Sequence, residues 1–258
     1  MTIEEAIQLA ENGDIGAIIS LGDYYMKQNT GEGISQAVEW YEKAAQKNVV
    51  YAILMTVLGK KILAYAGLQI ASHGEFGTDF LLDDWNEVYD WAAKELECIK
   101  NNVPGSERID VNEAIKNFEE ASYYLALCCY WGNKYSMARD LVCDFEDVRA
   151  QILNGASCLQ LAETNNEYAK AFKQLESIIK DAEYASANKA ALEEDVYALS
   201  ALQVSMMHKN AGSQSDMESA VSVLNYVLNA VKNDNNKQIL SGELRRYQKK
   251  LFGGYKYV

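Results

Sequence analysis

The chain has 258 residues and a formal net charge of −13, from 24 Lys and Arg against 37 Asp and Glu. This acidic balance opposes a nucleic-acid partner, because phosphate backbones are bound by clustered Lys and Arg, and it is compatible with a basic protein or peptide partner. The hydrophobic share of 49% is enough for a substantial core, and there is a single proline. Since proline breaks helix interiors, we expect an all-α chain.

The chain has no predicted export or membrane signal. Its first residues, MTIEEAIQLAENGD, contain neither a basic segment nor an apolar core, so we expect no signal peptide. The most apolar run, residues 49–71, is interrupted by Lys60 and Lys61, which favours a buried helix over membrane insertion. The five cysteines are an odd number without CxxC spacing, which predicts buried, reduced thiols in a cytoplasmic protein.

The first predicted helix covers Ile3–Asn12. Its apolar residues recur at the i, i+3, i+4, i+7 spacing of one helix face. Thr2 and Glu5 have the spacing of a capping box, and Gly13 is expected to end the helix.

Two helices are predicted next, over Asp14–Lys27 and Ser35–Lys47, joined by a turn at Asn29–Gly33. The pattern of small and aromatic residues here resembles a Sel1-like repeat, which is related to the tetratricopeptide repeat. The resemblance is carried by Ala17, Leu21–Gly22, Tyr25, Gly31-x-Gly33-Ile34, Ala37, Trp40–Tyr41, Ala44–Ala45 and Ala52. It covers one repeat, and Asn48 stands where the family usually has glycine.

The rest of the chain predicts further helices in pairs. They cover Val49–Ser72, Leu82–Asn101, Val111–Trp131, Tyr135–Phe145, Val148–Glu163, Glu167–Tyr184, Ala190–Lys209, Asp216–Val231 and Asp234–Phe252. The linker Asn101–Asp110 contains the proline and is the clearest break. We expect Sel1-like repeats over residues 1–101. Degenerate tetratricopeptide-like pairs with a C-terminal capping helix are expected over 102–258, in one continuous solenoid. The resemblance implies a right-handed α-α superhelix of antiparallel helix pairs.

The sequence contains no recognisable catalytic, cofactor or metal-binding motif, and we expect a protein that is not an enzyme. A remote alternative is an enzyme with a loop site around His73, with Glu75 and Asp79 nearby. Phe76, Phe80 and Trp85 beside this loop are either a contact patch or a seal of the loop onto the core.

The resemblance implies binding rather than turnover, by a scaffold or adaptor that holds a protein or peptide in a concave helical groove. The first helices of such repeats tend to line the inner surface, so Asp23, Tyr24 and Lys27 are candidate partner contacts. An alternative is a structural protein that self-assembles head to tail. The acidic N-terminal helices would then meet the basic end of the last helix, at Arg245, Arg246, Lys249 and Lys250. The partner and the oligomeric state stay open.

Overall fold

The computed structural model describes residues 2–70, 79–250 and 253–258. These residues form thirteen α-helices, one 3-10 helix and a two-stranded hairpin, which confirms the expected all-α class. The chain divides into two compact units, and the division falls inside helix α6, between Cys128 and Cys129. We call the N-terminal part unit 1 and the C-terminal part unit 2.

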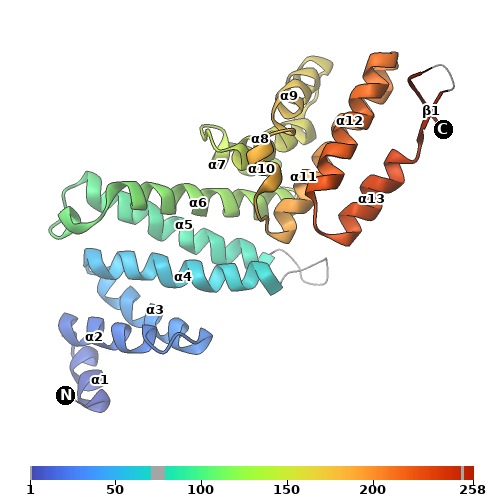
Figure 1. The fold of residues 1–258 in the computed structure, drawn as a ribbon. Helices are drawn as coiled ribbons and strands as arrows, with labels where there is room; N and C mark the ends of the chain where they lie inside the picture. The colour runs from blue at the N-terminus through green and yellow to red at the C-terminus, as the bar shows by residue number, and fades with distance from the viewer. Residues whose placement is uncertain (1, 71–78, 251–252) are drawn as a thin grey trace. The chain divides into compact units, whose positions relative to one another are not determined.

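Unit 1 is a series of helices in which sequence neighbours pack together (Figure 1). Contacts join α1 to α2, α2 to α3, α3 to α4 and α4 to α5. Its elements are α1 (Ile3–Glu11), α2 (Ile15–Met26), α3 (Gly31–Ala45), α4 (Val50–Ile70), α5 (Asp79–Lys100), η1 (Ser106–Arg108) and most of α6 (Val111–Trp131).

The start and end of α1 follow the sequence prediction. The backbone N–H of Glu5 donates to Thr2 Oγ1 at 3.2 Å, and that of Thr2 donates to Glu5 Oε2 at 2.8 Å, which completes the capping box. Gly13 follows the helix at a φ of +87°, a left-handed conformation that glycine adopts without steric cost.

Helix α3 begins at Gly31, before the predicted start at Ser35. Thr30 causes this earlier start, because its Oγ1 accepts a hydrogen bond from the Gly33 N–H at 3.0 Å and caps the helix. The predicted turn glycines therefore lie in the first helical turn. A Cβ at Gly33 would lie 2.9 Å from the backbone oxygen of Tyr25, so the missing side chain allows α2 and α3 to approach closely.

The Leu-Gly and Trp-Tyr parts of the repeat pattern meet between α2 and α3. Tyr41 is fully buried, and a Cβ at Gly22 would lie 2.5 Å from its ring carbon Cε1. The tyrosine ring thus lies directly on the backbone of α2, and the glycine makes room for it.

Helix α4 is strongly apolar, and Val50–Gln69 is long and apolar enough to cross a membrane by length and composition. In unit 1 this helix packs on α3 and α5. Lys60 lies within it and pairs with two acids, at 2.8 Å from Glu42 Oε1 and 2.5 Å from Glu87 Oε2. The absence of membrane insertion stays a prediction.

An aromatic cluster joins α4, α5 and α6. Trp85 is fully buried and stacks on Tyr124 with ring centroids 4.6 Å apart. Tyr65 packs edge-on against both rings. Trp85 is therefore a core residue. Phe76 lies outside the described residues, as does the side chain of Phe80.

Unit 2 continues from the end of α6 with seven helices among the described residues and the hairpin. Its elements are α7 (Tyr135–Val142), α8 (Val148–Leu161), α9 (Asn165–Ile178), α10 (Ala182–Ser186), α11 (Ala191–Ala211), α12 (Gln214–Ala230), α13 (Asp234–Leu244), β1 (Tyr247–Lys249) and β2 (Tyr255–Tyr257). Helices α7, α8 and α9 pack in sequence order, as do α11, α12 and α13, and α11 also contacts α8 and α9.

One predicted helix of unit 2 is broken in two. The sequence predicts Glu167–Tyr184 as one helix, but α9 ends at Ile178 and the short α10 begins at Ala182. The break comes from a new N-cap, because Asp181 Oδ1 accepts a hydrogen bond from the Tyr184 N–H at 2.7 Å.

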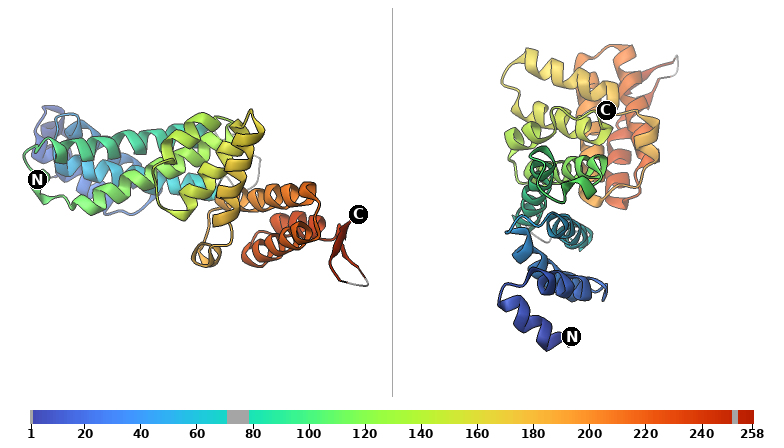
Figure 2. Two further views of the ribbon diagram at one scale, coloured as in Figure 1. Left: turned by 90° about the horizontal axis from the view of Figure 1, so that it is seen from above. Right: turned by 90° about the vertical axis from the view of Figure 1, so that its left-hand side faces the viewer.

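The predicted last helix, Asp234–Phe252, is also wrong at its end. Helix α13 stops at Leu244, and β1 pairs antiparallel with β2, with Gln248 opposite Lys256. Gly253 has a φ of +90°, a turn conformation that glycine allows. Figure 2 shows this hairpin at the edge of unit 2, outside α12 and α13.

The cysteines are all free thiols in the structure. Cys98, Cys128 and Cys129 are buried and Cys158 is half-buried, but Cys143 is exposed at the end of α7. The prediction of buried cysteines is therefore wrong for Cys143.

Candidate partner-binding site

The predicted contact residue Asp23 joins three helices. Its Oδ1 accepts hydrogen bonds from the hydroxyl groups of Tyr41 on α3, at 2.6 Å, and Tyr51 on α4, at 2.9 Å. Burial raises the pKa of Tyr51, and the hydrogen bond to Asp23 raises it further, so its hydroxyl is a donor at neutral pH. In the structure Asp23 therefore holds the hydroxyl groups of Tyr41 and Tyr51 in place.

The other two predicted contacts face solvent. Tyr24 is 44% exposed, and its ring lies edge-on to that of Tyr25 with centroids 5.2 Å apart. Lys27 is exposed at the C-cap of α2. Both side chains are accessible to a partner, but neither lines one of the pockets described below.

A pocket of about 430 Å³ lies beside Tyr51, and we call it the Tyr51 pocket. One wall is the α3–α4 turn with the start of α4, and the other is the linker between α5 and α6. It is lined by Asn48, Val49, Val50, Tyr51, Leu54, Pro104, Gly105, Arg108 and Ile109. The proline linker that marks a break in the sequence is therefore a wall of a pocket.

Hydrogen bonds hold the linker wall in place. The backbone N–H of Val103 donates to the Cys98 oxygen at 3.0 Å, and that of Ser106 donates to the Val103 oxygen at 2.9 Å. Gly105 adopts a φ of +97° and donates its N–H to Glu107 Oε2 at 2.8 Å. Because Asp23 fixes the Tyr51 hydroxyl on the opposite wall, the pocket is formed before any ligand enters.

Arg108 is the one charged residue among the described residues that line the Tyr51 pocket. Its side chain is 88% exposed, and its ion pair with Glu107 is long, at 4.0 Å. A guanidinium group in this position has donors available for a carboxylate or a backbone carbonyl. The pocket therefore combines an apolar interior with one cationic edge.

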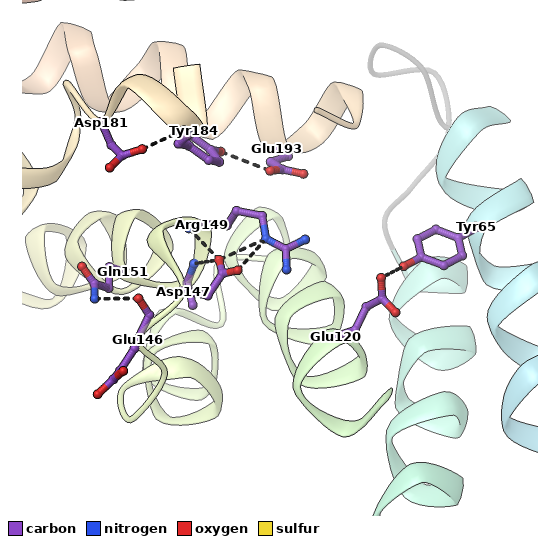
Figure 3. A network of polar contacts seen from close by, with 10 residues as sticks. Tyr65, Glu120, Glu146, Asp147, Arg149, Gln151, Asp181, Tyr184 and Glu193 are labelled. Atoms are coloured by element: carbon purple, nitrogen blue, oxygen red, sulfur yellow. Dashed lines mark hydrogen bonds and ion pairs between the residues drawn. The ribbon is translucent and has the colours of Figure 1, made fainter. Parts of the chain in front are cut away.

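A second pocket, of about 340 Å³, lies in unit 2, and we call it the acidic pocket. It is lined by Glu146, Asp147, Val148, Arg149, Asp181, Glu183, Tyr184 and Ala187. Figure 3 shows Asp147 and Arg149 side by side, with the Arg149 Nε 3.0 Å from Asp147 Oδ1. Burial raises the pKa of Asp147, but the hydrogen bonds and charge of Arg149 outweigh it and hold this pKa below its ordinary value.

The inner wall of the acidic pocket is a buried polar network. The Tyr184 hydroxyl donates to Glu193 Oε1 at 3.2 Å, as Figure 3 shows, and Lys189 Nζ donates to the Tyr184 backbone oxygen at 2.6 Å. Burial raises the pKa of Glu193. The mouth of the pocket carries four carboxylates against one guanidinium group, so it favours a cation.

The loop proposed for an enzyme site lies outside the described residues at His73 and Glu75, as does the side chain of Asp79. The other histidine, His208, is buried, with its Nε2 2.5 Å from Glu176 Oε1. Within residues 2–70, 79–250 and 253–258, no group of three His, Cys, Asp or Glu side chains has the geometry for a metal ion.

Sequence reasoning missed both pockets because each is lined by segments that lie far apart in the chain. Val50, Tyr51 and Leu54 follow a helical pattern that reads as core, and the pocket exists only because the distant linker lies against them. The available signal was the Pro104–Gly105 pair, which forbids a helix and forces an irregular wall.

No protein-family model matches this chain, and no curated protein matches it. The Sel1-like resemblance therefore rests on the residue pattern between Ala17 and Ala52.

Proposed function

We propose that the chain is a non-catalytic, cytoplasmic scaffold or adaptor of the Sel1-like and tetratricopeptide-like type, built as a right-handed helical solenoid. It binds a protein or peptide segment through unit 1. The observation that carries this proposal is the Tyr51 pocket, with its apolar lining and hydrogen-bonded walls. Pockets of this kind anchor one large apolar side chain of a partner, and such anchors dominate binding energy.

The Asp23 network supports this role. Tyr51 forms a pocket wall and is 45% exposed, yet its hydroxyl is fixed by Asp23. A rigid aromatic wall loses little conformational entropy when a ligand binds, which favours affinity. Asp23 therefore contributes to binding indirectly, while Tyr24 and Lys27 are candidate contacts for the flanking residues of the partner.

Two electrostatic effects bear in opposite directions on the charge of the partner. The net charge of −13 attracts a basic segment over a distance, whereas Arg108 favours a carboxylate next to the apolar anchor. Peptides selected on the intact chain from a random display library will show which of the two dominates.

The test compares such peptides on three proteins: the wild type, Leu54→Trp and Tyr24→Ala. Leu54 lines the Tyr51 pocket, and a tryptophan there fills it. We expect Leu54→Trp to weaken binding about tenfold or more, which corresponds to about 1.4 kcal/mol. Tyr24→Ala, an exposed aromatic outside the pocket, should change binding less. Equal binding by Leu54→Trp, with an unchanged circular dichroism spectrum, would contradict the proposal.

A further inference from the structure

The charges of the chain are strongly segregated along the sequence. Residues 245–258 contain five Lys and Arg and no Asp or Glu, which gives this segment a charge of +5 and leaves −18 on the rest of the chain. A segment with this charge is attracted to acidic surfaces, including those of another copy of the same chain.

The structure shapes this segment into an amphipathic ribbon, formed by β1 and β2. One face is aromatic and packs on unit 2: Tyr247 is buried and its hydroxyl donates to the Ser205 oxygen at 3.3 Å, and Lys209 Nζ lies 4.5 Å from the centre of the Tyr257 ring. On the other face Gln248 and Lys256 are cross-strand partners, and both are exposed. We call this element the basic ribbon.

Three cations of residues 245–258 are available to a partner: Lys249 and Lys256 on the basic ribbon, and Arg245 at the C-cap of α13. All three are exposed and form no ion pair with any residue that the structure describes. The other two are already held, since Arg246 Nη1 lies 3.2 Å from Glu243 Oε2 and Lys250 Nζ donates to Gln214 Oε1 at 3.2 Å. The outer edges of a two-stranded ribbon also carry backbone groups without strand partners.

We propose that the basic ribbon of one copy docks on the acidic pocket of a second copy. The complementarity is direct: the ribbon presents cations, and the mouth of the acidic pocket presents Glu146 and Glu183, both exposed, beside Asp147 and Asp181. A nucleic acid would meet the same ribbon, but the −18 on the rest of the chain repels it.

The two surfaces differ, so the contact is heterologous. Each docked pair leaves one ribbon and one acidic pocket unoccupied, and further copies add to both ends. Because the attraction is between exposed charges, added salt weakens it. At 0.1 M salt the Debye length is about 10 Å, and charges farther apart than this are largely screened.

The test uses two charge-reversal variants and one control. The ribbon variant is Lys249→Glu with Lys256→Glu, and the pocket variant is Glu146→Lys with Glu183→Lys, which avoids the capping residues Asp147 and Asp181. The control variant, Lys116→Glu with Lys173→Glu, makes the same charge change as the ribbon variant at exposed helical positions. Mass is measured by light scattering and by sedimentation velocity at low ionic strength.

We expect the wild type and the control to exceed the monomer mass of 28.9 kDa and to return to it when salt is added. Each reversal variant alone should stay monomeric. An equimolar mixture of the two should exceed the monomer mass, because the ribbon variant keeps its pocket and the pocket variant keeps its ribbon. A monomeric wild type, a monomeric mixture or a ribbon variant that still associates would each overturn the proposal. So would a monomeric wild type that binds an oligonucleotide or an anionic vesicle.

Discussion

The replacement of Gly22 by alanine tests the contact that organises the N-terminal repeat. An added Cβ would lie 2.5 Å from Cε1 and 2.7 Å from Cδ1 of Tyr41, which are distances that real side chains do not adopt. The ring cannot move away freely, because Tyr41 is fully buried and its hydroxyl is bound to Asp23 at 2.6 Å. The substitution must therefore displace the ring and disturb this hydrogen bond.

The expected change in the free energy of unfolding follows from three contributions, two that destabilise the fold and one that stabilises it. Overpacking a buried site costs about 1–3 kcal/mol, and the loss of a hydrogen bond to a charged group costs about 1.5–3 kcal/mol. Exchange of glycine for alanine in a helix interior stabilises by about 1 kcal/mol. The free energy of unfolding should therefore fall by about 1.5–5 kcal/mol in Gly22→Ala.

Urea denaturation followed by circular dichroism measures this change. The matched control is Gly242→Ala on α13, where, apart from the adjoining residues and helix backbone, no described atom lies within 4 Å of the position that a Cβ would take. The control should be stabilised by about 0.5–1 kcal/mol. If Gly22→Ala is stabilised as much as the control, the close contact with Tyr41 does not exist and the reasoning is refuted.

Three further substitutions test buried polar groups. Glu95 is fully buried, and burial raises its pKa although a hydrogen bond with Asn117 lowers it in part. Because the folded state then binds this proton more tightly than the unfolded state, the free energy of unfolding should fall as the pH rises from the unfolded to the folded pKa value. The fall is at most about 1.4 kcal/mol per pH unit. Glu95→Gln should flatten that slope in urea titrations from acidic to neutral pH, and an unchanged slope would show that Glu95 does not cause it. Asp23→Ala removes the acceptor of two tyrosine hydroxyls and should cost about 1.5–3 kcal/mol in thermal unfolding, with a smaller loss for Asp23→Asn. Glu194 accepts from the Lys232 N–H at 3.1 Å and the Asn233 N–H at 2.7 Å, so Glu194→Ala should cost about 1–3 kcal/mol. Amide exchange should then quicken at the start of α13, and unchanged protection there would count against this role.

Elements that depend on local signals were predictable from the sequence. Helix α6 has the predicted bounds, Val111–Trp131, because a sustained apolar stripe ends at Gly132 and at Asn133, which adopts a φ of +59°. The capping box at Thr2 is equally local, since both partners lie within one turn.

Elements that depend on distant contacts were not predictable. The basic segment after Leu244 has the composition of a helix end, but it forms a ribbon because Tyr247 packs on α11, 42 residues earlier at Ser205. The sequence alone marks Asp23 as a candidate surface contact. Only the fold, which places Tyr41 of α3 and Tyr51 of α4 beside it, makes Asp23 the acceptor of two hydroxyl hydrogen bonds.

The sequence by itself determined an acidic, all-α chain of neighbouring helices, because helix periodicity, capping and composition act within a few residues. The tertiary structure alone decided where the pockets lie. The Tyr51 pocket needs the linker at Pro104 to face the start of α4, about fifty residues away in the chain, and the acidic pocket needs α10 to lie beside the start of α8. Such juxtapositions depend on the packing of whole helices, which no local pattern records.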